Sequence, residues 1–137
     1  MKKLLLLFIL ICSYYNAQQN IAEIFSPRIK NQKNNSSFYF RILNVNRNEF
    51  NNYVNKSSSF VGLKKIKEGY STEYKIGSIY FSSTNPITLE QLTQLMKFLN
   101  LHEIHFDGKK ISVDEIKNQT IIVVERDESK NKTPRKN

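Results

Sequence analysis

The stretch Ile87-Thr88-Leu89-Glu90-Gln91-Leu92-Thr93-Gln94-Leu95-Met96-Lys97-Phe98-Leu99-Asn100 carries the clearest helical pattern in the chain and decides the fold class. Thr88 and Gln91 form a capping-box pattern, in which each side chain satisfies a backbone N–H at the start of a helix. The apolar residues recur at the three- and four-residue spacing that lines one helix face. Such a stripe can also meet a partner helix, but we expect it to face the core of this domain. Its members are Leu89, Leu92, Leu95, Met96 and Leu99.

The region before this helix carries three strand patterns and one further helix. Residues 38–45 (FYFRILNV) are aromatic and branched over the length of a strand. Asn46 and Glu49 then form a second capping box, which predicts the start of a helix. Residues 61–68 alternate weakly and residues 74–82 alternate clearly, so we predict two more strands, joined by a turn.

A hairpin and a short helix follow. Asp107-Gly108 is favoured in two-residue turns because both positions accept positive φ, so we predict a hairpin over 103–112. A third capping box at 112–115 predicts a short helix that ends near residue 118. Residues 120–125 (TIIVVE) are apolar and branched, and they predict a buried final strand.

The order strand, helix, strand, strand, helix, strand is that of the ferredoxin-like, split βαβ arrangement. We therefore predict an α+β domain over 38–125, with two helices on one face of an antiparallel sheet and an appended short helix and strand. Residues 18–37 are polar with little apolar periodicity, which predicts a loosely attached N-terminal arm. Residues 126–137 are highly charged and predict a disordered tail.

This order resembles that of two families, the heavy-metal-associated domains and the RNA-recognition motif. The first family carries Cys-x-x-Cys after its first strand, where this chain has Asn44-Val45-Asn46-Arg47. The second stacks bases on aromatics of its first and third strands. Here residues 75–81 (KIGSIYF) are only loosely similar to its third-strand motif, and Arg41 stands where a first-strand aromatic is needed. The resemblance is one of topology, and we expect no nucleic-acid partner.

The first residues predict export. Lys2 and Lys3 precede the apolar run 4–11, which is shorter than the roughly 20 residues that span a bilayer. Ala17 is a small residue suited to the position before a signal-peptidase cut. We predict a signal peptide over 1–17, no transmembrane span, and a periplasmic or secreted bacterial protein.

The single cysteine of the chain, Cys12, lies inside this predicted signal. A cysteine after an apolar run can carry a lipid, but Ile11 before it is bulky where lipoprotein signals have a small residue. A lipid anchor at Cys12 is therefore not our main expectation. Cleavage would remove the cysteine, so the remaining chain would hold neither a disulfide nor a thiolate metal site.

Charge is unevenly spread along the chain. Its 21 Lys and Arg outnumber 12 Asp and Glu, for a formal net charge of +9. Residues 28–75 hold ten basic and three acidic residues, whereas residues 87–125 hold four basic and six acidic ones. A fold that separates these halves has a basic side with affinity for polyanions. The alternative is that the charge serves solubility alone.

Binding candidates come from the uncovered sheet face of the predicted fold. If strand parity is as predicted, this face carries Tyr39, Arg41, Tyr74 and Tyr80. Our leading hypothesis is a non-enzymatic domain that contacts another protein or an envelope component through these residues. The alternative is that they are ordinary sheet residues beneath the N-terminal arm.

One cluster has metal-ligand chemistry: His102, Glu103, His105 and Asp107 lie within six residues. Residues three apart on a strand point to opposite faces, so His102 and His105 cannot reach one ion without a turn between them. Glu103 and His105, with Asp107, can share an exposed face as a weak site. Metal binding is thus the second hypothesis, and a polyanion-binding surface is the third.

Catalytic patterns are weak. Nucleophilic catalysis needs a Ser, Cys or Thr beside an oriented base, and the two histidines of the chain belong to the cluster above. The adjacent carboxylates Asp114 and Glu115 are explained by their capping position. We therefore expect no enzymatic activity and no cofactor.

Overall fold

The computed structural model describes residues 20–121. The predicted signal peptide over 1–17, including Cys12, and the predicted tail over 126–137 lie outside the described residues. So does most of the predicted strand over 120–125, of which Thr120 and Ile121 are described and are not in a strand.

Within the described residues the chain forms strands, α-helices and short 3-10 helices in an α+β order, as the sequence predicted. In chain order they are β1 (Ile21–Ile24), η1 (Ser26–Arg28), β2 (Ser36–Leu43), α2 (Arg47–Ser57), β3 (Lys64–Ser71), β4 (Ile76–Ser83), α3 (Leu89–Phe98), β5 (Glu103–Phe106), β6 (Lys109–Ser112) and η2 (Val113–Asn118).

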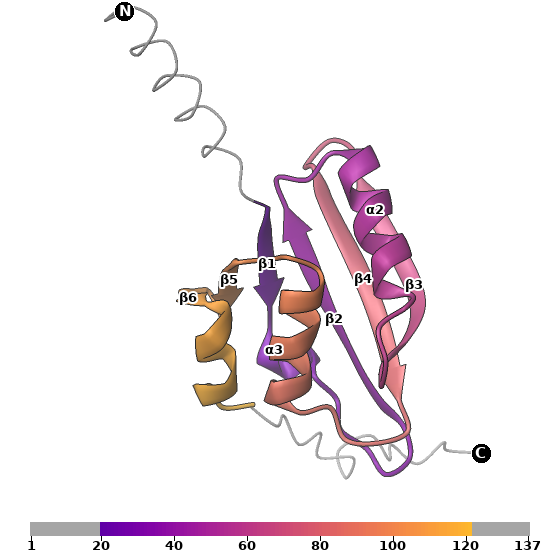
Figure 1. The fold of residues 1–137 in the computed structure, drawn as a ribbon, viewed down its shortest axis with the longest axis vertical. Coiled ribbons are helices and arrows are strands. Elements are labelled where there is room, and N and C mark those ends of the chain that lie inside the picture. Colours follow the sequence, from indigo (N-terminus) through magenta and orange to yellow (C-terminus); the bar gives the residue numbers. More distant parts are fainter. Residues whose placement is uncertain (1–19, 122–137) are drawn as a thin grey trace, which may run out of the picture.

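The strands form one sheet in the order β3-β4-β2-β1-β5-β6. Figure 1 shows α2, α3 and η2 on the same side of this sheet. The predicted antiparallel sheet is wrong in one respect, because β1 pairs antiparallel with β2 but parallel with β5. The sheet is therefore mixed.

Strand β1 lies within the segment predicted as a loosely attached arm, and Ser26, Ile29 and Ser36 of that segment are buried as well, so the prediction is wrong for these residues. Ala22 and Ile24 of β1 are buried, and Ile24 lies opposite Phe40 of β2 and Phe106 of β5. A four-residue strand has too few residues for its alternation to stand out in the sequence. Its pairing with two neighbours, rather than its own pattern, makes it a strand.

All three predicted capping boxes are present. Asn46 and Glu49 cap α2, and Thr88 and Gln91 cap α3, with reciprocal bonds of 2.9–3.1 Å between side chains and backbone N–H groups. The third box, at 112–115, begins the short helix η2, whose hydrogen bonding is of the 3-10 type. These boxes lie within four residues each, so the local sequence is sufficient to specify them.

The strands on either side of the β3–β4 turn begin later than predicted. Gly62 adopts φ +94° and Lys75 adopts φ +51°, both in the left-handed region that ends an extended segment. Strand β3 therefore begins at Lys64 rather than residue 61, and β4 at Ile76 rather than residue 74. Val61, predicted to share a strand face with Leu63, is 89% exposed.

The core lies between the sheet and the helices. Leu92, Leu95, Met96 and Leu99 of the predicted stripe are buried, and Leu89 packs against the core from its margin. Helix α2 inserts Phe50 directly over Gly77 of β4. A Cβ at Gly77 would lie 2.0 Å from the Phe50 ring, so the helix approaches the sheet this closely only because residue 77 is glycine.

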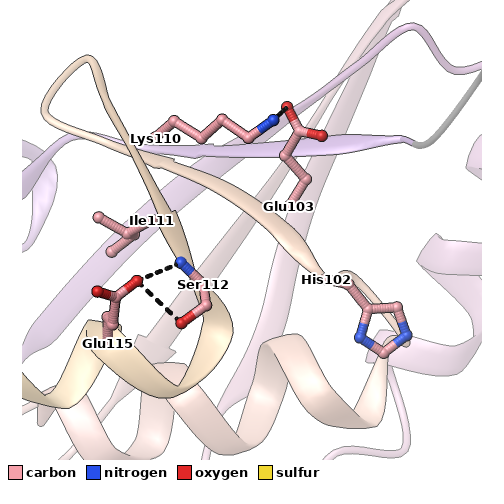
Figure 2. A pocket seen from close by; sticks show the side chains of 6 residues that line it. All are labelled: His102, Glu103, Lys110, Ile111, Ser112 and Glu115. Atoms are coloured by element: carbon pink, nitrogen blue, oxygen red, sulfur yellow. Dashed lines mark hydrogen bonds and ion pairs between the residues drawn. The ribbon is translucent and has the colours of Figure 1, made fainter.

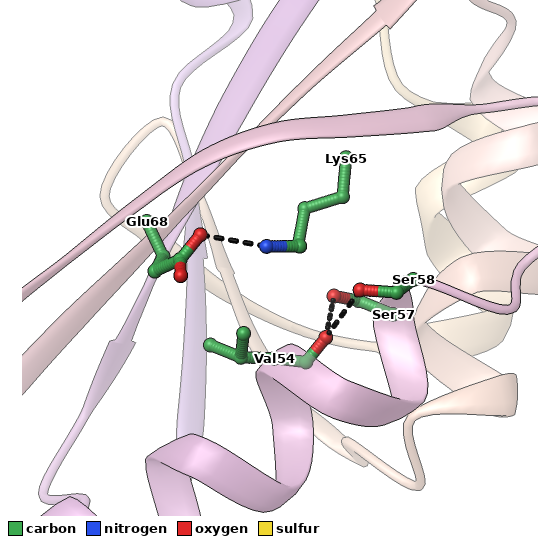
Figure 3. Close-up of polar contacts among 5 residues, drawn as sticks. All are labelled: Val54, Ser57, Ser58, Lys65 and Glu68. Carbon is green, nitrogen blue, oxygen red and sulfur yellow. Dashed lines mark hydrogen bonds and ion pairs between the residues drawn. The ribbon is translucent and has the colours of Figure 1, made fainter.

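The C-terminal end of α2 and the edge strand β3 each make local polar contacts (Figure 3). The hydroxyls of Ser57 and Ser58 donate to the Val54 carbonyl oxygen over 2.8 and 3.0 Å, and Lys65 pairs with Glu68 over 2.7 Å. The pairing of β3 with β4 is irregular between residues 65 and 67. Lysines and a bulge at an edge strand disfavour its pairing with another chain.

Candidate functional site

The side of the sheet away from the helices is the candidate site. Because side chains alternate along a strand, the residues between the buried ones point to this side. They are half-buried in the central strands and include apolar, aromatic and charged groups. We call this surface the open face. On β1, β2, β4 and β5 it comprises Ile21, Glu23, Ser37, Tyr39, Arg41, Leu43, Ile76, Ser78, Tyr80, Ser82, Glu103 and His105.

Two tyrosines lie side by side at the centre of the open face. Tyr39 of β2 is directly opposite Tyr80 of β4, and their rings stack with centroids 4.7 Å apart and planes at 30°. The Arg28 guanidinium lies over the Tyr39 ring at 5.5 Å, and the Lys67 ammonium lies over the Tyr80 ring at 5.7 Å. Both distances allow cation–π attraction. We call Lys67, Tyr80, Tyr39 and Arg28 the cationic tyrosine row.

Beside this row, Arg41 forms an ion pair. Its Nε donates to Glu23 Oε2 of β1 over 2.6 Å, and a second guanidinium nitrogen contacts the same oxygen. The guanidinium also lies over the Phe25 ring at 5.3 Å. Arg41 is therefore on the open face, as predicted, but its charge is compensated by a neighbouring carboxylate.

The far end of the open face holds a second compensated group. Glu103 of β5 accepts from the Lys110 ammonium over 3.2 Å and lies 3.5 Å from His105 Nε2. His105 is also in register with Glu23 on the adjacent strand β1. The acidic residues of the open face thus lie on β1 and β5, whereas the two tyrosines of the row lie on β2 and β4.

The structure brings together three of the four predicted binding residues. Tyr39, Arg41 and Tyr80 lie on the open face over β2 and β4. Tyr74 does not join them, because it lies in the turn before β4, where its side chain is 67% exposed. Its predicted strand position is wrong, since the left-handed residue Lys75 separates it from the strand.

The four predicted metal ligands do not converge. Glu103 and His105 share the open face as expected, but His102 is exposed and its Nε2 contacts Asn100 Oδ1 at 2.9 Å. Asp107 accepts from the Ser26 backbone N–H over 2.7 Å and from its hydroxyl over 2.6 Å. Within residues 20–121, no three His, Cys, Asp or Glu side chains are grouped to hold an ion.

A shallow hollow lies between the β5–β6 hairpin and η2 (Figure 2). Its lining includes His102 and Glu103, with Glu115 at the opposite wall. Glu115 is engaged there as a cap, because the Ser112 N–H and hydroxyl donate to its carboxylate over 2.7 and 2.9 Å. These two bonds lower the pKa of Glu115 below its usual 4.5. The hollow is open and its charges are of both signs, which does not define a ligand.

On the helix side, Asp114 pairs with Lys97 of α3 over 2.5 Å. The hydrogen bond and the positive charge of Lys97 lower the pKa of Asp114 below its usual 3.8. This ion pair joins η2 to α3, so both carboxylates adjacent in sequence have structural partners. The capping explanation of Asp114 and Glu115 accounts for Glu115, whereas Asp114 pairs with a neighbouring helix.

Sequence reasoning missed three charged residues on or beside the open face: Glu23, Arg28 and Lys67. The first two belong to the segment predicted as an arm, whose few branched residues form no sustained period. Lys67 was placed in a strand that alternates weakly, and the irregular pairing of β3 decides which way it points.

Comparisons with protein-family models, with curated proteins and with solved structures find no match for this chain. Among the helices of residues 20–121, none has the length and apolar character needed to cross a membrane. The function proposed below therefore rests on the residues of this chain.

Proposed function

We propose that this protein is an exported, non-enzymatic binding domain of the bacterial envelope or extracellular space, and that its open face makes the contact. One observation carries the proposal: α2, α3 and η2 lie on one side of the sheet, while the other side presents stacked aromatics and charged groups to solvent. Aromatic and arginine side chains are enriched at recognition surfaces. Export is proposed from the first 17 residues.

The connections support a ferredoxin-like arrangement widened by one strand. Strand β4 lies between β2 and β3, which α2 connects, and this is the split βαβ relationship. Strand β1 lies between β2 and β5, where the ferredoxin-like arrangement would pair its first and last strands directly. We propose that β1 broadens the open face and supplies Glu23 to it.

The test places a photo-crosslinking amino acid at one of two positions in the full-length protein. Ser78 lies on the open face between Arg41 and Gly69, and Gln94 is exposed on α3. The variants are expressed in the cell that makes the protein, and irradiated envelope and medium fractions are analysed by mass spectrometry. We expect a defined adduct from Ser78 and none from Gln94.

The intact mass of the protein purified from these fractions tests export. Cleavage after Ala17 leaves Gln18 as the first residue, which its intact mass reports directly. Adducts at Gln94 without adducts at Ser78 would assign binding to the helix side. A full-length mass in the cytoplasm would contradict export.

A further inference from the structure

We infer that the cationic tyrosine row binds an acidic polysaccharide that lies across the strands of the sheet. This inference rests on the proposed function, because it names the ligand of the same face. The row runs over β3, β4 and β2 to η1, which follows β1 in the chain. Neighbouring strands are about 4.8 Å apart, so the row offers polar groups at a regular short interval to an extended chain.

The ring faces of the two tyrosines are already occupied. Tyr39 and Tyr80 stack on each other, and the cations approach the pair from opposite ends, Lys67 from β3 and Arg28 from η1. A nucleic-acid base or an apolar ring therefore finds no free aromatic face on which to stack. The row presents instead its phenol hydroxyls, an ammonium and a guanidinium.

Within the described part of the chain, these groups have no hydrogen-bond or ion-pair partner. The hydroxyl of Tyr70 donates to a backbone carbonyl and that of Tyr53 accepts from Asn20, whereas those of Tyr39 and Tyr80 make no hydrogen bond to another group of residues 20–121. Arg28 and Lys67 likewise make no ion pair among residues 20–121, in contrast to Arg41 and Lys110. The row thus combines two uncompensated cations with two free hydroxyls.

An acidic polysaccharide complements this set. Its carboxylates match the cations, and its ring hydroxyls both donate to and accept from the phenols along an extended chain. A membrane surface fits less well, because only one of the four exposed large apolar residues among residues 20–121, Ile66 of β3, is next to a member of the row, Lys67. The other three lie elsewhere. Val61 and Tyr74 lie in loops, and Phe98 lies on α3.

The experiment measures binding of the protein, purified from the cell that makes it, to polygalacturonate and to neutral dextran. One double variant, Arg28→Gln with Lys67→Gln, removes the cations of the row. A matched control, Lys56→Gln with Lys117→Gln, removes the same charge from α2 and η2 on the helix side. A third variant, Tyr39→Phe with Tyr80→Phe, keeps the stack and removes both hydroxyls.

We expect polygalacturonate binding that weakens as salt rises, with no binding to dextran. The row double variant should weaken the Kd by about tenfold, as expected for two exposed charge contacts. The control should stay within about twofold, since its charges are screened from the open face. The phenylalanine variant should weaken binding by less than the row variant, because it retains the charges.

Several outcomes would overturn the inference. Equal losses in the row variant and the control would show a general charge effect. Tighter binding to single-stranded DNA, to polyglutamate or to vesicles of phosphatidylglycerol would assign the row to another class of partner. Absence of polygalacturonate binding, with a Ser78 adduct still found in cells, would reject this ligand and leave the proposed function standing. Adducts at Gln94 alone would reject both.

Discussion

Two aromatic pairs lie one residue apart on the same two strands and have opposite surroundings. Phe38 and Phe81 stack under the helices with ring centroids 5.2 Å apart, and both rings are buried. Tyr39 and Tyr80 stack on the open face at 4.7 Å, with a cation over each ring. In each pair, one residue lies on β2 and the other lies directly opposite it on β4.

The difference lies in what covers each pair. The phenylalanines stack with Phe40 within the buried core cluster, so they lose contact with water on folding. The tyrosines keep their hydroxyls at the surface, where the cations cover only the ring faces. Similar stacking geometry therefore contributes mainly to stability on one face, and on the other it leaves polar groups available for a ligand.

The strongest test of this comparison truncates neighbouring residues of β4. Phe81→Ala removes a fully buried ring and should lower the free energy of unfolding by about 3–5 kcal/mol. Tyr80→Ala removes a surface cross-strand pair and should cost about 1 kcal/mol or less. Urea unfolding followed by circular dichroism measures both. Equal costs for the two variants would mean that the open face is covered in the folded protein.

A second test concerns the β5–β6 turn, in which Asp107 bonds to the segment that follows β1. Asp107→Ala leaves the Ser26 N–H and hydroxyl, in a buried residue, without their acceptor, and should cost about 1–3 kcal/mol. Asp107→Asn is the matched control, because asparagine retains an acceptor oxygen and tolerates the positive φ of this residue. If asparagine costs as much as alanine, the two hydrogen bonds to Ser26 are not what stabilises the turn.

The smallest expected effect is on the pH dependence of stability, which should distinguish a carboxylate of the helix side from one of the open face. The cap bonds lower the pKa of Glu115 in the folded protein, so its contribution to stability is present above the usual pKa of 4.5. That contribution is lost as the pH falls through the lowered folded-state pKa. The urea midpoint should therefore fall less in Glu115→Gln than in the unchanged protein between about pH 6 and pH 3.

A control for this pH test replaces an open-face carboxylate instead. Glu103→Gln leaves the Glu115 cap in place. The fall in urea midpoint that is attributed to this cap should therefore persist in the Glu103→Gln variant. If Glu115→Gln and the unchanged protein lose stability in parallel, the cap carries no proton-linked stability. In that case, the pH dependence of stability does not distinguish Glu115 on the helix side from Glu103 on the open face.

The local sequence predicted those parts of the fold whose causes lie within a few residues. The capping boxes at Asn46, Thr88 and Ser112 are each complete within four residues. The Asp107-Gly108 turn adopts the positive φ angles that its sequence favours. The leucine stripe predicted the covered side of α3 for the same reason. The alternation of β2 also placed Tyr39 and Arg41 correctly on one face.

The sequence predicted only part of the candidate site, because the positions of its other residues depend on pairing with other strands. Glu23 reaches the open face through the pairing of β1 with β2, the next strand, and with β5, which is far away in the chain. Lys67 reaches it through an irregularity in the β3–β4 pairing. Neither arrangement leaves a periodic trace, since a four-residue strand and a bulge both fall below the length at which alternation can be recognised.

By itself, therefore, the sequence determined the helix starts, the hairpin turn and the parity of the central strands, because short-range hydrogen bonds and side-chain alternation specify them. Tertiary structure alone decided that an apparent arm becomes an interior strand, that Tyr74 leaves the sheet, and that Arg28 and Lys67 meet the two tyrosines. The physical reason is that strand pairing joins residues far apart in the chain, and its energy comes from neighbours that local sequence does not contain.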